Sequence, residues 1–263
     1  MTTNEIQKLI QEVVQIAHDA GAKIMEVYED IDNFNVEIKD DNSPLTRADR
    51  EANAIICEGL EQLNQKLPII SEENKAIPYE ERKDYDYVWM VDPLDGTKEF
   101  IKRNGEFTVN IALIHKNRSI AGVVYAPAKD EMYFAVEGTG AYRVLESQNV
   151  RLVVNHYSTS DDGLRIVCSR SHLNDATQAF IDQFSNPEKV STGSSLKFLI
   201  IAKGGAEIYP RLAPTMEWDT AAAQIILEEA GGSVLQADSS QPVQYNKEDL
   251  LNPQFIATAH QTN

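Results

Sequence analysis

Six short apolar or alternating runs between residues 69 and 145 are the feature that most constrains the fold of this chain. Each run has the length and composition of a β-strand and is bounded by polar or turn-forming residues. The runs are Ile69–Ile70, Tyr87–Val91, Phe107–Ile114, Ile120–Tyr125, Glu131–Val136 and Ala141–Val144. This part of the chain therefore predicts a multi-stranded sheet, which other segments have to cover with apolar faces.

Two amphipathic helices are expected before these runs. Apolar residues recur at three- and four-residue steps over residues 6–28, and Thr2 with Glu5 forms a capping-box pattern at the start. A second helical pattern begins near residue 46 and continues to residue 63, and we expect Pro68 to end it. The first part of the chain thus predicts helices followed by a sheet.

Strands and helices alternate after residue 150. The expected strands are Arg165–Cys168, Ala206–Tyr209, Ser233–Leu235 and Phe255–Ala259, and the expected helices are Asn174–Phe184, Ser194–Lys203 and Glu217–Ala230. Together these patterns predict an α/β protein of two packed halves, residues 1–150 and 151–263, with a boundary between residues 145 and 160. A cleft between the halves is where we expect a site.

Charge and cysteine content narrow the classes of function. The 263 residues include 24 Lys and Arg against 41 Asp and Glu, which gives a net charge of −17. Such a field repels nucleic-acid polymers, whereas a small phosphorylated ligand fits if divalent cations and a few local bases offset the field. The two cysteines, Cys57 and Cys168, are too few for a disulfide framework and favour a reducing compartment.

The sequence carries no recognisable export or membrane signal. Its first residues lack the basic stretch and apolar run of a signal peptide. The most apolar stretches fall well short of the ~20 residues that span a bilayer. We therefore expect a cytoplasmic protein, and the sequence leaves open both peripheral association with the inner membrane and the oligomeric state.

The densest polar motif is Asp92-Pro93-Leu94-Asp95-Gly96-Thr97, directly after the apolar run Tyr87–Val91. We expect a strand followed by an acidic turn, in which Asp92 and Asp95 point into one site. A proline stiffens such a turn, and Gly96 allows the backbone to approach a ligand closely. Hard carboxylate oxygens favour Mg²⁺. For this motif taken alone, an exposed turn without function is the alternative.

Further carboxylates lie at the ends of other expected elements. Glu72 and Glu73 follow the apolar residues 69–70, as a multi-ligand metal site needs, although a solvated loop has the same pattern. Asp219 lies in the first turn of an expected helix, where interaction with the helix dipole accounts for an acid without function. Asp49 stands three residues after Thr46, a spacing for which helix capping is the simplest interpretation.

Other patterns indicate no additional cofactor. The segment Gly138-Thr139-Gly140 lacks the third glycine of a dinucleotide-binding loop, so we interpret it as a hairpin turn. The sequence contains no P-loop, HExxH, CxxC or GxSxG motif, and its five histidines show no metal-ligand spacing. Only His172, in Ser169-Arg170-Ser171-His172, is kept as a candidate site residue.

Three motifs of this chain resemble, in order and spacing, the signature set of the inositol monophosphatase superfamily, the Mg²⁺-dependent, Li⁺-sensitive phosphatases. They are Glu72-Glu73, Asp92–Thr97 and Glu217-Trp218-Asp219-Thr220-Ala221-Ala222. Within this set, Gly96–Leu113 resembles the 3'(2'),5'-bisphosphate nucleotidases of the CysQ type, whereas inositol monophosphatases proper continue the motif as GTTNF. The resemblance covers about Lys39 to Gly232 and implies a five-layered αβαβα sandwich with metals between the halves.

The resemblance also implies a metal site and a catalytic pair. Two or three Mg²⁺ ions would be held by Glu72, Asp92, Asp95, Asp219 and the backbone carbonyl of Leu94. Glu72 would hold the ion that lowers the pKa of a water, and the Thr97 hydroxyl, oriented by Asp49, would accept or relay the proton. Asp49, Thr97 and Glu72 are therefore the candidate catalytic residues.

The same resemblance implies a binding site for a phosphorylated nucleotide. The N–H groups of Gly96 and Thr97, at an expected helix start, would bind the phosphate oxygens. The other substrate contacts implied are Glu72, Leu94, Asp95, His172, Ser194, Lys197, Arg211 and Asp219. Of these, Ser194, Lys197 and Arg211 would bind a second phosphate and His172 would lie nearer the base. An alternative for Lys197 and Arg211 is that both are ordinary surface charges.

The function implied is removal of the 3'-phosphate from adenosine 3',5'-bisphosphate to give AMP, with its sulfated precursor 3'-phosphoadenylyl sulfate as a further substrate, in nucleotide recycling during sulfur assimilation. A first alternative is a phosphatase of the same superfamily for inositol phosphates, fructose bisphosphate or NADP. A second is a metal- or nucleotide-binding module without turnover. The presence of both Asp49 and Thr97 argues against the second, because binding alone does not require that pair.

Overall fold

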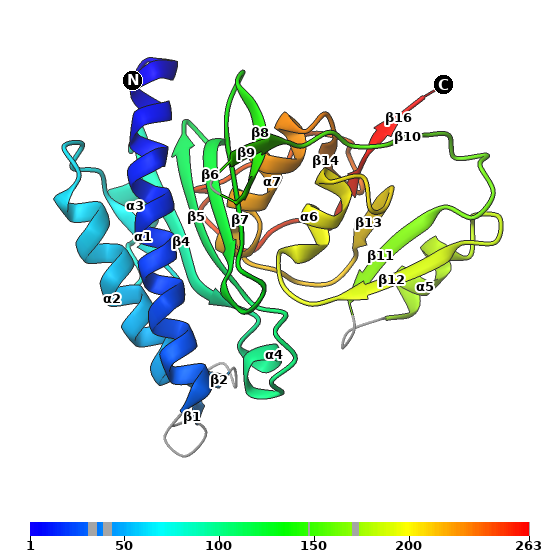
Figure 1. The fold of residues 1–263 in the computed structure, drawn as a ribbon. Helices are drawn as coiled ribbons and strands as arrows, with labels where there is room; N and C mark the ends of the chain where they lie inside the picture. Colours follow the sequence, from blue (N-terminus) through cyan, green and yellow to red (C-terminus); the bar gives the residue numbers. More distant parts are fainter. Residues whose placement is uncertain (31–35, 39–43, 147, 170–173, 263) are drawn as a thin grey trace.

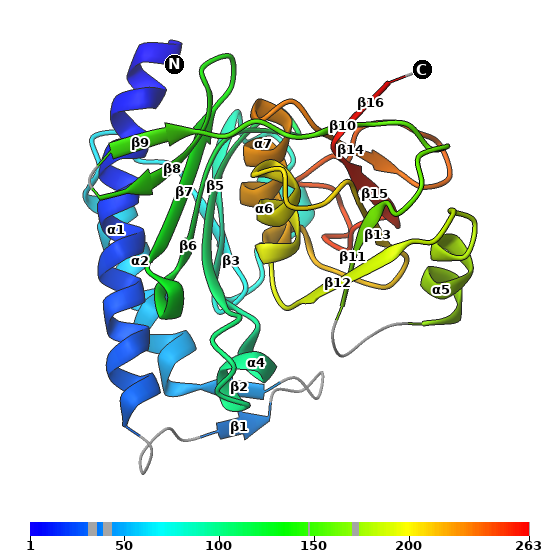
Figure 2. The ribbon, with the colours of Figure 1, turned by 45° about the vertical axis from the view of Figure 1, so that its right-hand side comes forward.

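Two sheets and the helices on their faces form five successive layers (Figures 1 and 2). The computed structural model describes residues 1–30, 36–38, 44–146, 148–169 and 174–262. The layers run from a helix pair through a seven-stranded sheet, a second helix pair and a five-stranded sheet to an outer helix. This order confirms the five-layered αβαβα sandwich expected from the sequence.

The seven-stranded sheet consists of consecutive strands. They are β3 (Ile69–Ser71), β4 (Tyr87–Asp95), β5 (Thr108–His115), β6 (Arg118–Ala126), β7 (Glu131–Val136), β8 (Gly140–Leu145) and β9 (Gln148–Arg151), in that spatial order. Only β3 and β4 are parallel, and the other neighbours are antiparallel. A short helix, α3 (Tyr79–Arg82), connects β3 to β4, and α4 (Thr97–Ile101) and the single turn η1 (Pro127–Lys129) lie in later connections.

Both faces of this sheet are buried, which explains why its strands read as continuous apolar runs. In β4, Val88 and Met90 belong to the core between the two sheets, whereas Trp89 and Val91 belong to the core on the opposite face. That opposite face is covered by α1 (Thr3–Glu29) and α2 (Arg47–Gln62) (Figure 1). The apolar stripes of these two helices therefore have a partner along their whole length.

The middle layer consists of α6 (Leu196–Ala202) and α7 (Ala221–Glu229), which lie between the two sheets (Figure 2). Helix α7 approaches β6 at Gly122, where a Cβ atom would lie 2.6 Å from the carbonyl oxygen of Ala222. A side chain at this position of β6 would push α7 away. Gly122 thus allows α7, and the turn before it, to lie close to the large sheet.

The five-stranded sheet has the order β12-β11-β13-β15-β14. Its strands are β11 (Arg165–Ser169), β12 (Glu188–Thr192), β13 (Ile208–Arg211), β14 (Ser233–Gln236) and β15 (Phe255–Thr258). Helix α5 (Asp175–Ile181) covers its outer side (Figure 2). Two small strand pairs complete the described structure: β1 (Val36–Ile38) with β2 (Pro44–Thr46), and β10 (His156–Tyr157) with β16 (His260–Gln261).

Several boundaries differ from the sequence expectations. The helix expected over 217–230 is a single 3₁₀ turn, η2 (Glu217–Asp219), followed by α7, because Thr220 leaves helical geometry at φ −123°. The second helix ends at Gln62 rather than near Pro68, since Leu63 is extended. The helices expected over 174–184 and 194–203 are shorter, and the polar strands β9 and β12 were not expected. The Gly138–Gly140 segment is the expected hairpin turn, between β7 and β8.

Within the described parts of the chain, no helix combines the length and the apolar character needed to cross a bilayer.

Candidate metal and phosphate site

The acidic motif lies inside β4 rather than in a turn after it, so the expected strand-then-turn layout is wrong. Asp92 pairs with Asn110 of β5, and Asp95 pairs with Thr108, so a β-bulge inserts one extra residue between the two acids. Because side chains alternate along a strand, residues three apart normally point to opposite faces. The bulge returns Asp95 to the face of Asp92, and so the local backbone brings both carboxylates to one site.

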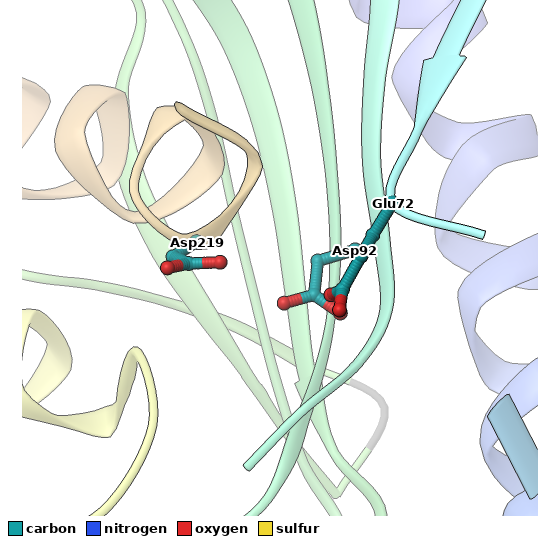
Figure 3. A group of neighbouring side chains, drawn as sticks. All are labelled: Glu72, Asp92 and Asp219. Carbon is teal, nitrogen blue, oxygen red and sulfur yellow. The ribbon is translucent and has the colours of Figure 1, made fainter. Parts of the chain in front are cut away.

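Three carboxylates from three different segments meet at this site. Glu72 follows β3, Asp92 lies in β4, and Asp219 ends η2, and one oxygen from each lies within 4.8 Å of the other two. Figure 3 shows Glu72 and Asp92 side by side, with Asp219 facing them from the turn before α7. The Glu72 N–H donates to the carbonyl of Val91 at 3.1 Å, which extends the β3–β4 pairing up to the ligand.

The electrostatics of the cluster fit a bound cation. Burial, reinforced by the neighbouring carboxylates, raises the pKa of Asp92 and Asp219 well above the ordinary range. Burial also raises the pKa of Asp95, although Lys197 opposes that shift. Carboxylates that repel one another in a buried place are stabilised by a divalent ion with hard-oxygen preference, such as Mg²⁺.

The Leu94 carbonyl adds an uncharged oxygen to this set. It accepts a hydrogen bond from the Thr97 hydroxyl at 3.3 Å, so it lies on the same side of β4 as the catalytic candidates. The Leu94 N–H donates to Asp92 at 3.0 Å, which holds the bulge in place. The residues present therefore fit a magnesium site, with Glu72, Asp92, Asp95, Asp219 and the Leu94 carbonyl as the donors.

Asp49 has two sets of partners. One carboxylate oxygen accepts from the N–H of Thr46 at 2.7 Å and from its hydroxyl, and the other accepts from the Thr97 hydroxyl at 3.1 Å. The capping interpretation is thus correct but incomplete. Burial raises the pKa of Asp49, while the hydrogen bonds from Thr46 and Thr97 oppose the shift. Thr97 begins α4 directly after Gly96, whose φ of +95° favours glycine.

Two neighbouring hollows make up the site. One surrounds the carboxylates, and the other, of about 140 Å³, contains the candidate contacts for a second phosphate. Ser194, Lys197 and Arg211 line this second hollow together with Tyr209, and both Asp95 and Asp219 line it as well as the hollow around the carboxylates. Lys197 is only 7% exposed, so the surface-charge alternative is wrong for this residue. Burial lowers the pKa of Lys197 to about 8, with Arg211 reinforcing the shift and Asp95 opposing it.

Sequence analysis did not single out the polar residues that attach the start of α6 to the site. The Ser195 N–H donates to Asp95 at 2.6 Å, and the Ser195 hydroxyl lies 2.8 Å from Thr108 and donates to Asn110 at 2.8 Å. Thr108 also lies 2.5 Å from the Ser194 hydroxyl. The available signal was the presence of two polar residues at alternate positions in the otherwise apolar run 107–114.

Of the sequence-predicted site residues, His172 lies outside the described residues. The structure brings the other candidates together around the end of β4, from seven segments of the chain. Asp219 belongs to the 3₁₀ turn η2 and not to the first turn of a helix. In η2 its carboxylate accepts a hydrogen bond from the Met216 N–H at 2.9 Å.

Comparison with known proteins places these features in a family context. The sequence model of the inositol monophosphatase family matches residues 5–263. The 3'(2'),5'-bisphosphate nucleotidase CysQ of Salmonella typhimurium is 40% identical over 258 residues, covering 96% of this chain and 100% of the relative. The protein of the same name from Escherichia coli strain K12 is 41% identical over 254 residues, covering 94% and 98%.

Solved structures give a corresponding result. The crystal structure of CysQ from Bacteroides thetaiotaomicron, described as a bacterial member of the inositol monophosphatase family, superposes with a TM-score of 0.85. It is 45% identical in sequence, and the match covers 97% of this chain and 98% of that chain. The fold of SuhB from Bartonella henselae also matches, with a TM-score of 0.77 at 25% identity.

Proposed function

This chain belongs to the inositol monophosphatase family, and from that premise we propose that it is a 3'(2'),5'-bisphosphate nucleotidase that removes the 3'-phosphate of adenosine 3',5'-bisphosphate. Relatives with 40% and 41% identity over nearly the whole chain bear that name. The observation that carries the proposal is that the carboxylate cluster and the buried Lys197 line adjoining hollows joined at Asp95 and Asp219. A substrate with two phosphates needs two adjacent anion sites of this kind.

Hydrolysis of a phosphate monoester is slow because its negative oxygens repel the attacking water. Mg²⁺, two or three ions in our proposal, supplies positive charge against the phosphate oxygens, lowers the pKa of water and stabilises the leaving oxygen. Glu72, Asp92, Asp95, Asp219 and the Leu94 carbonyl would hold it. The rest of the reaction depends on groups of the chain itself.

Thr97 and Asp49 are positioned to take the proton of the attacking water. The Thr97 hydroxyl already donates to Asp49 at 3.1 Å, so its lone pairs are left to accept a proton. As the water attacks phosphorus, its proton passes to the Thr97 oxygen while the Thr97 proton passes to Asp49. The bond from phosphorus to the ribose 3'-oxygen breaks, and the departing oxygen takes a proton from solvent water. Burial favours the protonated form of Asp49, which suits a temporary proton acceptor.

The remaining substrate contacts orient the phosphates. We propose that the N–H groups of Gly96 and Thr97, at the start of α4, donate to oxygens of the scissile phosphate. Lys197 and Arg211, with Ser194, would bind the 5'-phosphate across Asp95, and His172 would contact the base. The 3'-phosphoadenylyl sulfate carries the same 3'-phosphate and is the expected second substrate. Such a reaction would contribute to nucleotide recycling during sulfur assimilation.

The assignment of residues 1–150 and 151–263 to two subdomains, one carrying most metal ligands and the other the substrate pocket, belongs to the same proposal. Inhibition by Li⁺ and a cytoplasmic location stay predictions from the sequence, which leaves open peripheral association with the inner membrane. A titration of Li⁺ against Mg²⁺ in the phosphate-release assay tests the first of them.

The direct test of the site is the Asp95→Asn variant. Asp95 belongs to both hollows, so its loss should reduce phosphate release from adenosine 3',5'-bisphosphate to background at any Mg²⁺ concentration while the circular dichroism spectrum stays that of the native chain. Asp162→Asn, an exposed aspartate of the second half, is the matched control and should retain activity. Turnover by Asp95→Asn at the native rate would remove Asp95 from the metal site.

A further inference from the structure

Glu217 is part of the motif that supplies Asp219, yet the proposed reaction gives it no role. Its side chain is fully buried, at 0% exposure. One oxygen of its carboxylate accepts from the Asn246 N–H, and the other accepts from the Lys247 N–H at 3.2 Å and pairs with the Lys247 ammonium. The η2 turn is thus attached through Glu217 to a loop that lies about thirty residues further along the chain.

The Asn246 side chain continues this connection to another segment. Its carbonyl oxygen accepts from the Arg82 guanidinium at 2.8 Å, and its amide donates to the Arg82 carbonyl at 2.9 Å. The same guanidinium donates to the carbonyls of Lys247 and Glu248 at 2.6 and 2.8 Å. Asn246 and Arg82 are 4% and 3% exposed, so the whole connection is shielded from water.

Arg82 ends α3, which belongs to the connection that leaves β3 through Glu72 and returns to β4. Its Nε atom donates to the Ile77 carbonyl at 3.2 Å, which folds this connection back on itself. The chain of contacts Arg82–Asn246–Glu217 therefore runs from the segment after Glu72 to the turn that presents Asp219. We call these three residues the buried bridge.

Asp219 is the ligand whose position neither sheet fixes, whereas Glu72 is held against β4 by the hydrogen bond from its N–H to the Val91 carbonyl. Asp92 and Asp95 share one strand, whereas Asp219 lies in a turn that is in neither sheet, and Glu72 follows the last residue of β3. Buried charged groups are costly unless they are fully hydrogen-bonded, and removing one partner of such an arrangement strongly disturbs the others. The bridge therefore fixes the η2 turn, and Asp219 with it, against the β3–β4 connection that follows Glu72.

We propose that Glu217, Asn246 and Arg82 are positioning residues that hold Asp219 against the β3–β4 connection, at the distance from Glu72 that a metal ion requires. This inference rests on the proposed function, because it takes the carboxylate cluster to be the magnesium site. The bridge touches neither metal nor substrate. It acts by keeping the ligands in place before the ion arrives, so that binding needs no rearrangement of η2.

A purely stabilising role is the competing explanation, and a second buried glutamate supplies the control for it. Glu207 is 6% exposed, pairs with Arg165, accepts from the Arg165 N–H at 2.8 Å and accepts from Asn155 at 3.0 Å. It thus resembles Glu217 in burial and in its number of partners. It lies directly before β13 and makes no described contact with the segments that carry the metal ligands.

The test is calorimetric titration of Mg²⁺ into the nucleotide-free full chain, comparing the native protein with Glu217→Gln, Arg82→Lys and Glu207→Gln. We expect Glu217→Gln and Arg82→Lys to weaken Mg²⁺ binding by about tenfold or more, in the range typical of residues that support metal ligands. Their kcat should recover at saturating Mg²⁺, while the half-saturating Mg²⁺ concentration stays raised. Glu207→Gln should lower the melting temperature and leave Mg²⁺ affinity unchanged.

Native Mg²⁺ affinity in both bridge variants overturns the proposal, as does an equal loss of affinity in Glu207→Gln. If Glu217→Gln fails to fold, Arg82→Lys still tests the proposal. Lysine keeps the positive charge but lacks the several N–H donors of the guanidinium group. Native protein that binds Mg²⁺ but releases no phosphate refutes the proposed function and not the bridge. Native protein that binds no Mg²⁺ overturns both.

Discussion

Asp49 combines two functions that its sequence position does not separate, since it closes the start of α2 and accepts the hydrogen bond of Thr97. A capping acid at this position of a helix is common in proteins. The proposed chemical role of Asp49 comes from its hydrogen bond with Thr97, which lies far along the chain. Glu5 occupies the equivalent position at the start of α1, where it accepts from the Thr2 N–H at 2.7 Å and from the Thr2 hydroxyl at 3.0 Å.

The pair Asp49→Asn and Glu5→Gln separates the two functions. If Asp49 takes a proton through Thr97, Asp49→Asn should lower kcat by about 10²-fold or more with little change in KM, because base assistance is lost and binding is not. Glu5→Gln should leave kcat unchanged and alter stability little, because a glutamine at this position can also complete a capping box. A rise in KM without loss of kcat in Asp49→Asn would contradict the role of Asp49 in proton transfer.

The ligand set could be named from the sequence because its acidic motifs resemble the signature set of a known family, whereas position alone marked only Glu72, Asp92 and Asp95 as acids after apolar runs. Lys197 could not be separated from a surface charge, since its burial depends on packing between α6 and the five-stranded sheet rather than on its neighbours in the chain. Thr108 and Asn110 were missed for a related reason. Their hydrogen bonds reach Ser194 and Ser195, and no local pattern encodes such a contact.

At the scale of elements, the site depends on irregularities that sequence periodicity does not reveal. The bulge in β4 and the break between η2 and α7 each set the direction of a ligand, Asp95 in the first case and Asp219 in the second. Strand and helix patterns predicted the elements on both sides of these points. They could not predict the one extra residue or the non-helical Thr220, because both arise from tertiary packing around the acids.

Helix α7 carries a titratable group remote from the reaction. Burial raises the pKa of Glu228 to about 7, while the hydrogen bond from Gln224 at 2.8 Å and the charge of Arg118 oppose the shift. The folded protein therefore binds a proton at Glu228 that the unfolded chain has lost above its ordinary pKa of 4.5. By linkage, this group makes the folded state less stable as the pH rises from about 4.5 through about 7.

Glu228→Gln should remove this pH-dependent loss. The variant should be more stable than the native chain at pH 8 by about 1–3 kcal/mol, with the difference vanishing below pH 4.5. Urea unfolding of the variant and of the native chain across this pH range measures the difference in stability. Glu58→Gln, on the exposed side of α2, is the matched surface control for the substitution. A parallel stability profile for Glu228→Gln and the native chain would refute the raised pKa.

At the scale of the whole molecule, the net charge of −17 and the cluster of acids lead us to expect that cations stabilise the folded chain. The layers bring the carboxylates together with Asp92 buried and Glu72 and Asp219 partly buried, so their repulsion opposes folding in the metal-free chain. The overall architecture was predictable from the order of apolar runs and from the resemblance. The strength of the repulsion between the carboxylates was not predictable, since it depends on the distances set by the completed fold.

Removal of Mg²⁺ should therefore lower the melting temperature, and Asp92→Asn should abolish that response. An ion present at 100 times its dissociation constant stabilises the folded state by about 2.7 kcal/mol. A carboxyl whose pKa is raised on folding costs stability above its unfolded pKa, so Asp92→Asn should be more stable than the native chain in the presence of a chelator at pH 7. An Mg²⁺-dependent melting temperature in Asp92→Asn would contradict its place in the site.

The most direct test of the whole account is phosphate release with Mg²⁺ from four substrates at equal concentration: adenosine 3',5'-bisphosphate, AMP, inositol 1-phosphate and fructose 1,6-bisphosphate. The account predicts strong preference for the first and no release from AMP, because Lys197 and Arg211 bind the second phosphate while the carboxylate cluster acts on the 3'-phosphate. A preference for inositol 1-phosphate or fructose 1,6-bisphosphate, or no release from any substrate, would contradict it.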